Sequence, residues 1–233
     1  MILQDRDQKI LGLAKEHHFL TLEQIQPLFR EGSKCESARR IRELSRAGYF
    51  YKERSLRLGR KPLFRLTSKG AQRANEVSPF EIKPRRFLNH ATLEHDAIVT
   101  GARVILERHF QGSLFTPEEA LKAEERSQIP DGIFTFRTKR AVALEIENSE
   151  KWSTRFLKIH ERWDQEPNIF LVLFVATTPA IETRLKHLIP QIKSRQPFGV
   201  ILWDDLKDGK EDVWCPKKTR TLAQLKERLE CIE

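Results

Sequence analysis

The chain is poor in residues that would build a covalent framework or a cofactor site. It has three cysteines, and they lie far apart at positions 35, 215 and 231 of the 233-residue sequence. Neither a Cys-x-x-Cys pair nor a histidine at zinc-finger spacing occurs, which argues against a disulfide framework and a structural zinc. A glycine-rich phosphate loop is also missing, because residues 59–62 (Gly-Arg-Lys-Pro) lack a second glycine. We therefore expect no ATP hydrolysis.

Long apolar runs are missing as well. No stretch of 18 apolar residues occurs, and the chain turns polar within its first six residues. A helix needs about 20 apolar residues to cross a bilayer, and a cleavable signal needs an apolar segment. The sequence therefore predicts a soluble, cytoplasmic protein without a membrane partner.

Basic charge is concentrated in one part of the chain. Residues 39–73 hold twelve Lys or Arg against two acids, a net of +10, although the whole chain carries only +9. After residue 86 the counts are 22 basic and 23 acidic residues. Because the surplus of positive charge is confined to one segment, it indicates a surface that binds a polyanion. It does not indicate a charge spread over the whole protein for solubility.

The spacing of these charges predicts a helix that begins at Ser33. Ser33 and Glu36 have the spacing of a capping box. In the helix that follows, Ile41 and Leu44 fall on one side, and the arginines at 39, 42 and 46 fall on the other. Arginines on an amphipathic helix are often only its solvated face. Here the cluster has a single sign and continues into a second basic element, which favours nucleic-acid binding.

The neighbouring segments predict two more short helices and a hairpin. Residues 7–16 and 21–29 have helical spacing of apolar residues, and the second segment opens with its own capping box. Downstream, residues 49–56 and 61–66 predict strands around the basic turn at 57–60.

Three short helices followed by a basic hairpin resemble the winged helix-turn-helix of bacterial regulators. The resemblance includes Leu-Thr at 20–21, Ala-Gly-Tyr at 47–49 and Leu-Thr-Ser-Lys-Gly at 66–70. It implies that residues 33–47 enter the major groove of DNA and that the hairpin touches the backbone or the minor groove. The implied groove contacts are Arg39, Arg40, Arg42 and Arg46, and the implied wing contacts are Arg54, Arg57, Arg60 and Lys61.

The rest of the chain has room for a second domain. We predict the DNA-binding domain at residues 1–75, a linker with two prolines at 76–89, and the second domain at 90–233. Helical and strand patterns alternate in the second domain, which predicts an α/β (α+β) sandwich around a mixed sheet. The expected helices are 92–109, 116–125, 152–163 and 179–194, and the expected strands are 113–115, 132–136, 141–147, 169–175 and 198–203.

Three carboxylates gather in the hairpin of this second domain. Asp131 precedes its first strand, and Glu145 and Glu147 alternate onto one face of its second strand. Carboxylates this close repel one another unless a hard divalent cation lies among them, and Mg²⁺ or Mn²⁺ suits oxygen ligands. Pro130-Asp131 with the Glu-x-acid segment resembles the PD-(D/E)XK nucleases, which implies a restriction-endonuclease-like fold with Asp131 and Glu145 as metal ligands.

The chain departs from that superfamily at its lysine position, where it has Glu147. The lysine orients the attacking water and offsets phosphate charge, so a carboxylate removes a cation where charge develops. An active enzyme would need a cation from Lys151, Arg155 or Lys158, and its site would comprise Asp131, Glu145, Glu147 and Lys158. The alternative is that the domain keeps the fold as a scaffold or dimerisation module without cleaving DNA.

Taken end to end, the chain resembles the replication-relaxation family of plasmid and mobile-element proteins. That resemblance adds His95, within Leu-Glu-His-Asp at 93–96, to the features above. It implies a role in the replication, transfer or regulation of a mobile element. We predict a homodimer that binds double-stranded DNA sequence-specifically, needs no cofactor for binding, and acts as a transcriptional regulator or accessory factor beside other mobile-element proteins. The alternative is a Mg²⁺- or Mn²⁺-dependent endonuclease that the winged helix directs to its site.

Overall fold

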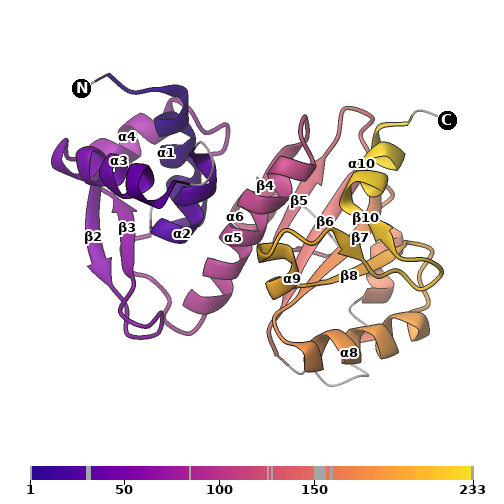
Figure 1. Ribbon diagram of the computed structural model, residues 1–233. Coiled ribbons are helices and arrows are strands. Elements are labelled where there is room, and N and C mark those ends of the chain that lie inside the picture. Colours follow the sequence, from indigo (N-terminus) through magenta and orange to yellow (C-terminus); the bar gives the residue numbers. More distant parts are fainter. Residues whose placement is uncertain are drawn as a thin grey trace. The chain divides into compact units, whose positions relative to one another are not determined.

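The protein is a mixed α and β structure that divides into two compact units. The computed structural model describes residues 2–29, 33–83, 85–124, 126, 128–149, 156–157 and 160–231 (Figure 1). The first unit comprises residues 1–104 and the second residues 105–233, so the boundary falls inside helix α5 (Leu93–His109). Within the described residues, no helix combines the length and the apolar character that a membrane span requires.

The first unit combines short helices with a small antiparallel sheet. Strand β3 (Pro62–Leu66) lies between β1 (Leu20–Thr21) and β2 (Phe50–Arg54). The helices pack around a core that includes Ile10, Leu13, Ile25, Ile41, Leu44, Phe50 and Phe64. They are α1 (Asp5–His17), α2 (Leu22–Ile25) with the 3₁₀ turn Gln26–Leu28, α3 (Lys34–Arg46), α4 (Ser68–Asn75) and the first part of α5.

Side-chain caps explain where these helices begin. Thr21 caps α2 in the predicted capping box, in which the Gln24 side chain accepts from the Thr21 backbone N–H at 2.7 Å. Thr67 caps α4 by accepting from the Gly70 N–H at 3.1 Å. A hydroxyl at this position satisfies a backbone donor that has no partner within the helix.

Residues 76–89, which we predicted as a linker, lie inside the first unit. The Lys15 ammonium donates to the Phe80 carbonyl at 2.6 Å, and the Ser78 hydroxyl donates to Glu16 Oε1 at 2.7 Å. Glu16 also pairs with Arg103 on α5 at 2.5 Å, and all four polar side chains of this cluster are buried. Prolines and a lack of periodicity are typical of an interdomain linker, but here polar contacts attach the segment to α1.

The second unit is built on a five-stranded mixed sheet in the order β4-β5-β6-β7-β8. The first three strands pair antiparallel and the last three pair parallel. The strands are β4 (Leu114–Pro117), β5 (Gly132–Thr135), β6 (Ala141–Glu147), β7 (Ile169–Ala176) and β8 (Phe198–Leu202). The other elements are α6 (Glu118–Leu121), the 3₁₀ turn Glu161–Gln165, α8 (Pro179–Leu188), the 3₁₀ turn Ile189–Gln191, α9 (Trp203–Lys207), β9 (Asp212–Val213), β10 (Arg220–Thr221) and α10 (Leu222–Glu230).

The apolar strands of this sheet are buried as their composition requires. Every residue of β7 except Phe170 is buried, which fits a parallel strand covered on both faces. On one face, Ala143 of β6 and Phe174 of β7 belong to a core with Ile181 and Leu185 of α8. On the other face, the Phe110 ring meets Phe134 edge-on at 5.3 Å between the ring centroids.

Two expectations for this unit are corrected by the strand pairing. The acidic helix predicted at 116–125 is a single turn, because Thr116 and Pro117 pair with Ile133 and Gly132 and extend β4 instead. The helix predicted at 179–194 ends at Leu188, and Pro190 lies in the 3₁₀ turn that follows. Half of the helix predicted at 152–163 falls outside the described residues, and its described end belongs to the 3₁₀ turn Glu161–Gln165.

Candidate nucleic-acid interface

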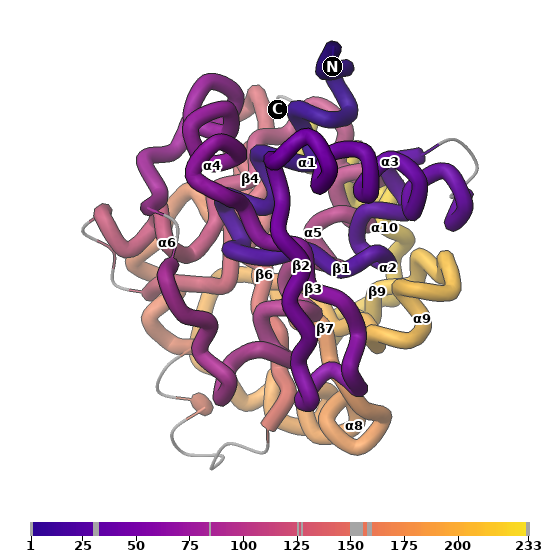
Figure 2. The backbone as a smooth tube through the Cα atoms, turned by 90° about the vertical axis from the view of Figure 1, so that its left-hand side faces the viewer, coloured from indigo at the N-terminus to yellow at the C-terminus, as the bar shows by residue number. Residues whose placement is uncertain are grey.

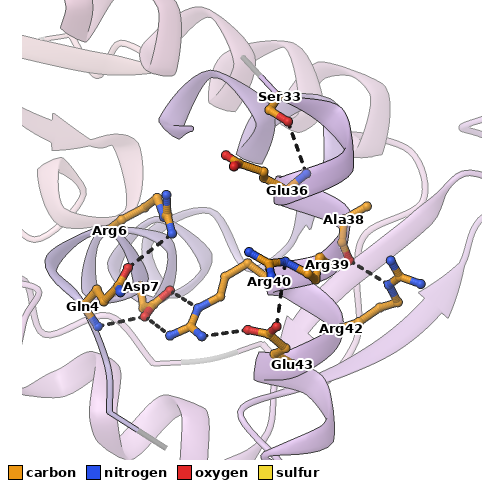
Figure 3. Close-up of polar contacts among 10 residues, drawn as sticks. All are labelled: Gln4, Arg6, Asp7, Ser33, Glu36, Ala38, Arg39, Arg40, Arg42 and Glu43. Atoms are coloured by element: carbon orange, nitrogen blue, oxygen red, sulfur yellow. Dashed lines mark hydrogen bonds and ion pairs between the residues drawn. The ribbon is translucent and has the colours of Figure 1, made fainter. Parts of the chain in front are cut away.

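Helix α3 begins at Ser33, as the sequence predicts. The Ser33 hydroxyl accepts from the Glu36 N–H at 3.3 Å, which is one half of the predicted capping box (Figure 3). Ser37, Ile41 and Leu44 are buried along one side of the helix. The helix is therefore fixed to the first unit by an apolar stripe, and its opposite side carries arginines.

Arg40 does not belong to that exposed side. Its Nε and Nη2 donate to the two carboxylate oxygens of Asp7 at 2.8 and 2.5 Å, and its Nη1 donates to Glu43 at 2.8 Å (Figure 3). The Asp7 side chain is fully buried, and that of Arg40 is 16% exposed. We predicted Arg40 as a groove contact, but this paired geometry makes it an internal link between α3 and α1.

The link shifts the ionisation of its members. Burial alone would raise the pKa of Asp7, yet hydrogen bonds from Arg40 and from the Gln4 N–H outweigh burial and lower it. The hydrogen bonds to Asp7 raise the pKa of Arg40. The hydrogen bond from Arg40 also lowers the pKa of Glu43. All three groups are thus charged at neutral pH and compensate one another.

Arg39, Arg42 and Arg46 are exposed on α3, as predicted. Arg39 approaches Glu43 only at 4.0 Å, and its side chain is 72% exposed. Arg42 Nε donates to the Ala38 carbonyl at 3.0 Å, so one edge of the guanidinium is fixed to its own helix (Figure 3). Its two terminal nitrogens are the pair that bidentate recognition of a guanine edge would use.

A hollow of about 350 Å³ separates α3 from the β2–β3 hairpin. Arg42 and Arg46 line it from the helix, and Lys52 lines it from β2. Lys52 was not among the predicted contacts. The sequence could have indicated Lys52, because residues 52 and 54 of a strand point to the same face and Arg54 was a predicted contact. The hollow therefore brings cations from two elements to one surface.

Two of the predicted sequence motifs meet where α3, the hairpin and α4 join. The Thr67 hydroxyl donates to the Gly48 carbonyl at 2.6 Å, and the Lys69 ammonium donates to the Ala47 carbonyl at 2.7 Å. A Cβ at Gly70 would lie 2.1 Å from the Tyr49 carbonyl oxygen, so only glycine fits there. Ala-Gly-Tyr and Leu-Thr-Ser-Lys-Gly therefore fix the hairpin against α3.

The hairpin ends in a basic loop at residues 55–61. Gly59 and Arg60 both adopt positive φ, and the Arg60 N–H donates to the Ser55 carbonyl at 2.9 Å. This loop lies at the end of the hairpin remote from α3 (Figures 1 and 2). The predicted strands reach 56 and 61, whereas β2 ends at Arg54 and β3 begins at Pro62, so the turn is wider than predicted.

Lys61, predicted as a wing contact, has a partner at the base of this loop. Its ammonium donates to both carboxylate oxygens of Glu23 on α2, at 2.8 and 2.9 Å. Several other cations of α3 and the hairpin behave differently. In the part of the chain that the structure describes, a set of exposed cations forms no ion pair: Lys34, Arg42, Arg46, Lys52, Arg54, Arg57 and Arg60.

The predicted carboxylate site lies in the second unit. Gly132 pairs with Leu144, so Asp131 and Glu145 are neighbours across β5 and β6. Asp131 Oδ2 accepts from the Ile146 N–H at 2.6 Å. A Cβ at Gly132 would lie 2.1 Å from the Phe115 ring, which explains the glycine after Asp131 by packing alone.

Glu147 shares one strand face with Glu145 and is buried. Its Oε1 accepts from the N–H and the hydroxyl of Ser149 at 3.4 and 3.3 Å, and it lines a small cavity with Arg184 of α8. Within the described ranges, no three His, Cys, Asp or Glu side chains form a group that could hold a metal ion. Binding of Mg²⁺ or Mn²⁺ by these carboxylates stays a prediction, and we derive no step through the ion. Lys151, Arg155 and Lys158 lie outside the described residues.

Comparisons with known proteins bring no relative. No family model, no curated protein and no solved structure matches the chain. The account of function therefore depends on the residues and their contacts.

Proposed function

We propose that the protein binds double-stranded DNA through α3 and the β2–β3 hairpin, which together act as a winged helix-turn-helix. In this arrangement α3 enters the major groove, where Arg42 and Arg46 read base edges. The loop at 55–61 contacts the phosphate backbone as the wing. The resemblance to mobile-element replication-relaxation proteins makes such an element the proposed context, with a role in regulation, replication or transfer.

One observation carries this proposal: among the described residues, seven exposed cations of α3 and the hairpin form no ion pair, while four acids close to them in the first unit are paired with other cations. Asp7 and Glu43 pair with Arg40, Glu23 pairs with Lys61, and Glu53 pairs with Arg65 at 3.0 Å. The positive field of the remaining cations is therefore not cancelled locally. A polyanion that displaces counterions is the partner such a surface favours.

The second unit serves, in this proposal, as a nuclease-like scaffold that pairs two copies of the chain. The order α5, β4, β5, β6, β7, α8, β8 around a mixed sheet supports a fold of that type. A dimer would present two recognition helices to two half-sites. Sedimentation of the full chain tests this part, and a monomer at tens of micromolar that binds DNA no more tightly than the isolated first unit would overturn it.

The DNA-binding proposal is tested by matched variants in the two hairpins. Arg57 in the β2–β3 loop and Arg137 in the β5–β6 turn are both exposed arginines, and neither forms an ion pair in the described structure. Arg57→Ala should weaken binding to a fluorescent duplex, whereas Arg137→Ala, with the same loss of charge, should leave it unchanged. Equal effects of the two variants would mean that binding reflects net charge and not this surface.

The alternative, cleavage of DNA, is tested with supercoiled plasmid in the presence of Mg²⁺ or Mn²⁺. We expect no nicks above background, because Glu147 occupies the position at which the PD-(D/E)XK nucleases have a lysine, which removes a cation where charge develops. Metal-dependent nicking that disappears in Glu145→Gln would replace the scaffold proposal with the endonuclease.

A further inference from the structure

A cavity of about 560 Å³ lies at the amino ends of β7 and β8 in the second unit. Phe170 and Leu171 of β7 and Phe198 of β8 form part of its wall. Glu145 and Glu147 align with the carboxyl end of β7, so the cavity is at the opposite end of the parallel strands from the carboxylate hairpin. It is a separate feature, with a volume typical of small-molecule sites.

The charged residues of this cavity are all basic. No Asp or Glu lines it, and its cations are Arg195, Lys217, Lys218, Arg220 and Arg228. Within the ranges that the structure describes, none of these five forms an ion pair. Asp164 accepts from the Ser194 hydroxyl and the Arg195 N–H at 2.8 and 2.7 Å and so fixes the rim of the cavity. Cations that share one cavity repel one another until an anion enters.

Hydrogen bonds order the backbone segments that carry some of these cations. Val200 of β8 and Trp214 exchange two backbone hydrogen bonds of 2.8 Å, which fixes the segment that leads into Cys215 and Lys217. The Arg140 guanidinium donates to the Arg228 carbonyl at 2.8 Å at the end of α10. The cavity is thus formed by ordered elements, which lowers the entropy cost of binding.

Cys215, Arg220 of β10 and Arg228 of α10 line the same cavity. Burial raises the pKa of the Cys215 thiol, and the charges of Arg220 and Arg228 oppose that rise. Two elements therefore supply cations to one cavity, as recognition of several oxygens of one anionic group requires.

We propose that this cavity binds a small phosphorylated molecule of about nucleotide size. A phosphate carries up to two charges and several acceptor oxygens, and so matches a group of arginines and lysines better than a single carboxylate does. The apolar wall, which includes Ile189 and Leu225, would cover the rest of the ligand. Such a ligand would be an effector or a substrate.

The test uses the full-length chain with Cys35→Ser and Cys231→Ser, which remove the two exposed thiols and leave Cys215. The rate of alkylation of Cys215 by neutral iodoacetamide is measured with ADP, pyrophosphate or adenosine. ADP and pyrophosphate at about ten times their Kd should slow alkylation about tenfold by mass action, and adenosine should not. Titration calorimetry with ADP gives the Kd independently of the thiol.

A matched pair of double variants makes the test specific. Lys217→Ala with Arg220→Ala should weaken ADP binding about tenfold or more, the effect of losing a charge-assisted hydrogen bond to the anion. Lys193→Ala with Arg137→Ala removes the same charges outside the cavity and should leave the Kd unchanged. The proposal is overturned if neither ADP nor pyrophosphate binds at millimolar concentration, if the two double variants behave alike, or if only duplex DNA protects Cys215.

Discussion

Two hairpins of this molecule carry clustered charge, and their charged side chains differ in the partners they have. In the β2–β3 hairpin, Arg54, Arg57 and Arg60 are exposed and form no ion pair among the described residues. In the β5–β6 hairpin, Asp131 accepts from the Ile146 N–H and Glu147 accepts from Ser149. A charge cluster in a sequence therefore indicates a ligand only where the fold leaves the charges uncompensated. The arginines of the first hairpin meet that condition, whereas Asp131 and Glu147 of the second hairpin accept hydrogen bonds within their own unit.

The same contrast occurs within one helix. Arg40 and Arg42 are two residues apart on α3, yet Arg40 pairs with buried Asp7, while Arg42 bonds only its own helix and remains exposed. One arginine contributes to stability and the other is available to a partner.

The largest effect is expected from Arg40→Ala. The substitution leaves the Asp7 carboxylate buried without its cation, and breaking a buried pair in this way costs about 3 to 5 kcal/mol of unfolding free energy. Arg42→Ala removes the same side chain from an exposed position and should change stability by less than about 0.5 kcal/mol. Urea denaturation of both variants measures the difference. Equal losses would show that Arg40 has no special structural role.

Arg42→Ala should act on DNA recognition instead. Loss of a bidentate contact to a base edge costs about 1 to 3 kcal/mol at one base pair and relaxes the preference there. Arg57→Ala is the control, because a phosphate contact should weaken all sequences alike. Competition binding against single-base-pair variants of the site separates the two. If Arg42→Ala lowered the affinity for every DNA sequence equally, the proposal that α3 reads bases in the major groove would be contradicted.

Asp131→Ala tests the structural role of the Asp131 carboxylate in the β5–β6 hairpin. The variant leaves the Ile146 N–H without its acceptor, which should cost about 1 to 3 kcal/mol of stability. Asp204→Ala, at an exposed carboxylate on α9, is the control and should have little effect. Millimolar Mg²⁺ should leave the Tm of the wild type unchanged. A Mg²⁺-dependent rise in Tm that Asp131→Ala abolishes would instead indicate a metal site.

His17 should add a weak pH dependence to the stability of the first unit. Burial, and then the charges of Arg103 and His18, hold the pKa of His17 well below its ordinary value. Below about pH 6.5 the His17 imidazole therefore binds a proton in the unfolded chain but not in the folded chain. Stability should decrease there by at most about 1.4 kcal/mol per pH unit. His17→Gln should lack this component and His187→Gln, at an exposed site, should keep it; identical slopes would contradict the assignment.

The sequence predicted the elements that carry strong local signals. The hairpin at 132–147, the buried strand at 169–175 and the helix at 92–109 match β5, β6, β7 and α5 because apolar period and length specify them. The C-terminal elements from α9 to α10 were not predicted, since short strands such as Asp212–Val213 have almost no period of their own.

The candidate site was less predictable than the fold because its charges are sorted by tertiary contacts. Arg40 and Arg42 look alike in sequence, and only the packing of α1 against α3 brings Asp7, 33 residues away, to Arg40. The pair Lys61–Glu23 spans 38 residues in the same way. Helical spacing predicts which arginines share a face, but it does not predict which of them find a partner.

The salt dependence of DNA binding tests the central claim most directly. Binding of the wild type to a duplex, followed by anisotropy between about 50 and 200 mM salt, should weaken with a log–log slope of several units, since each neutralised phosphate contributes about 0.9. Replacing Arg54 and Arg57 together by alanine should reduce that slope by about 2 units. A flat dependence in the wild type, or an unchanged slope in the double variant, would contradict the assignment of this surface to DNA.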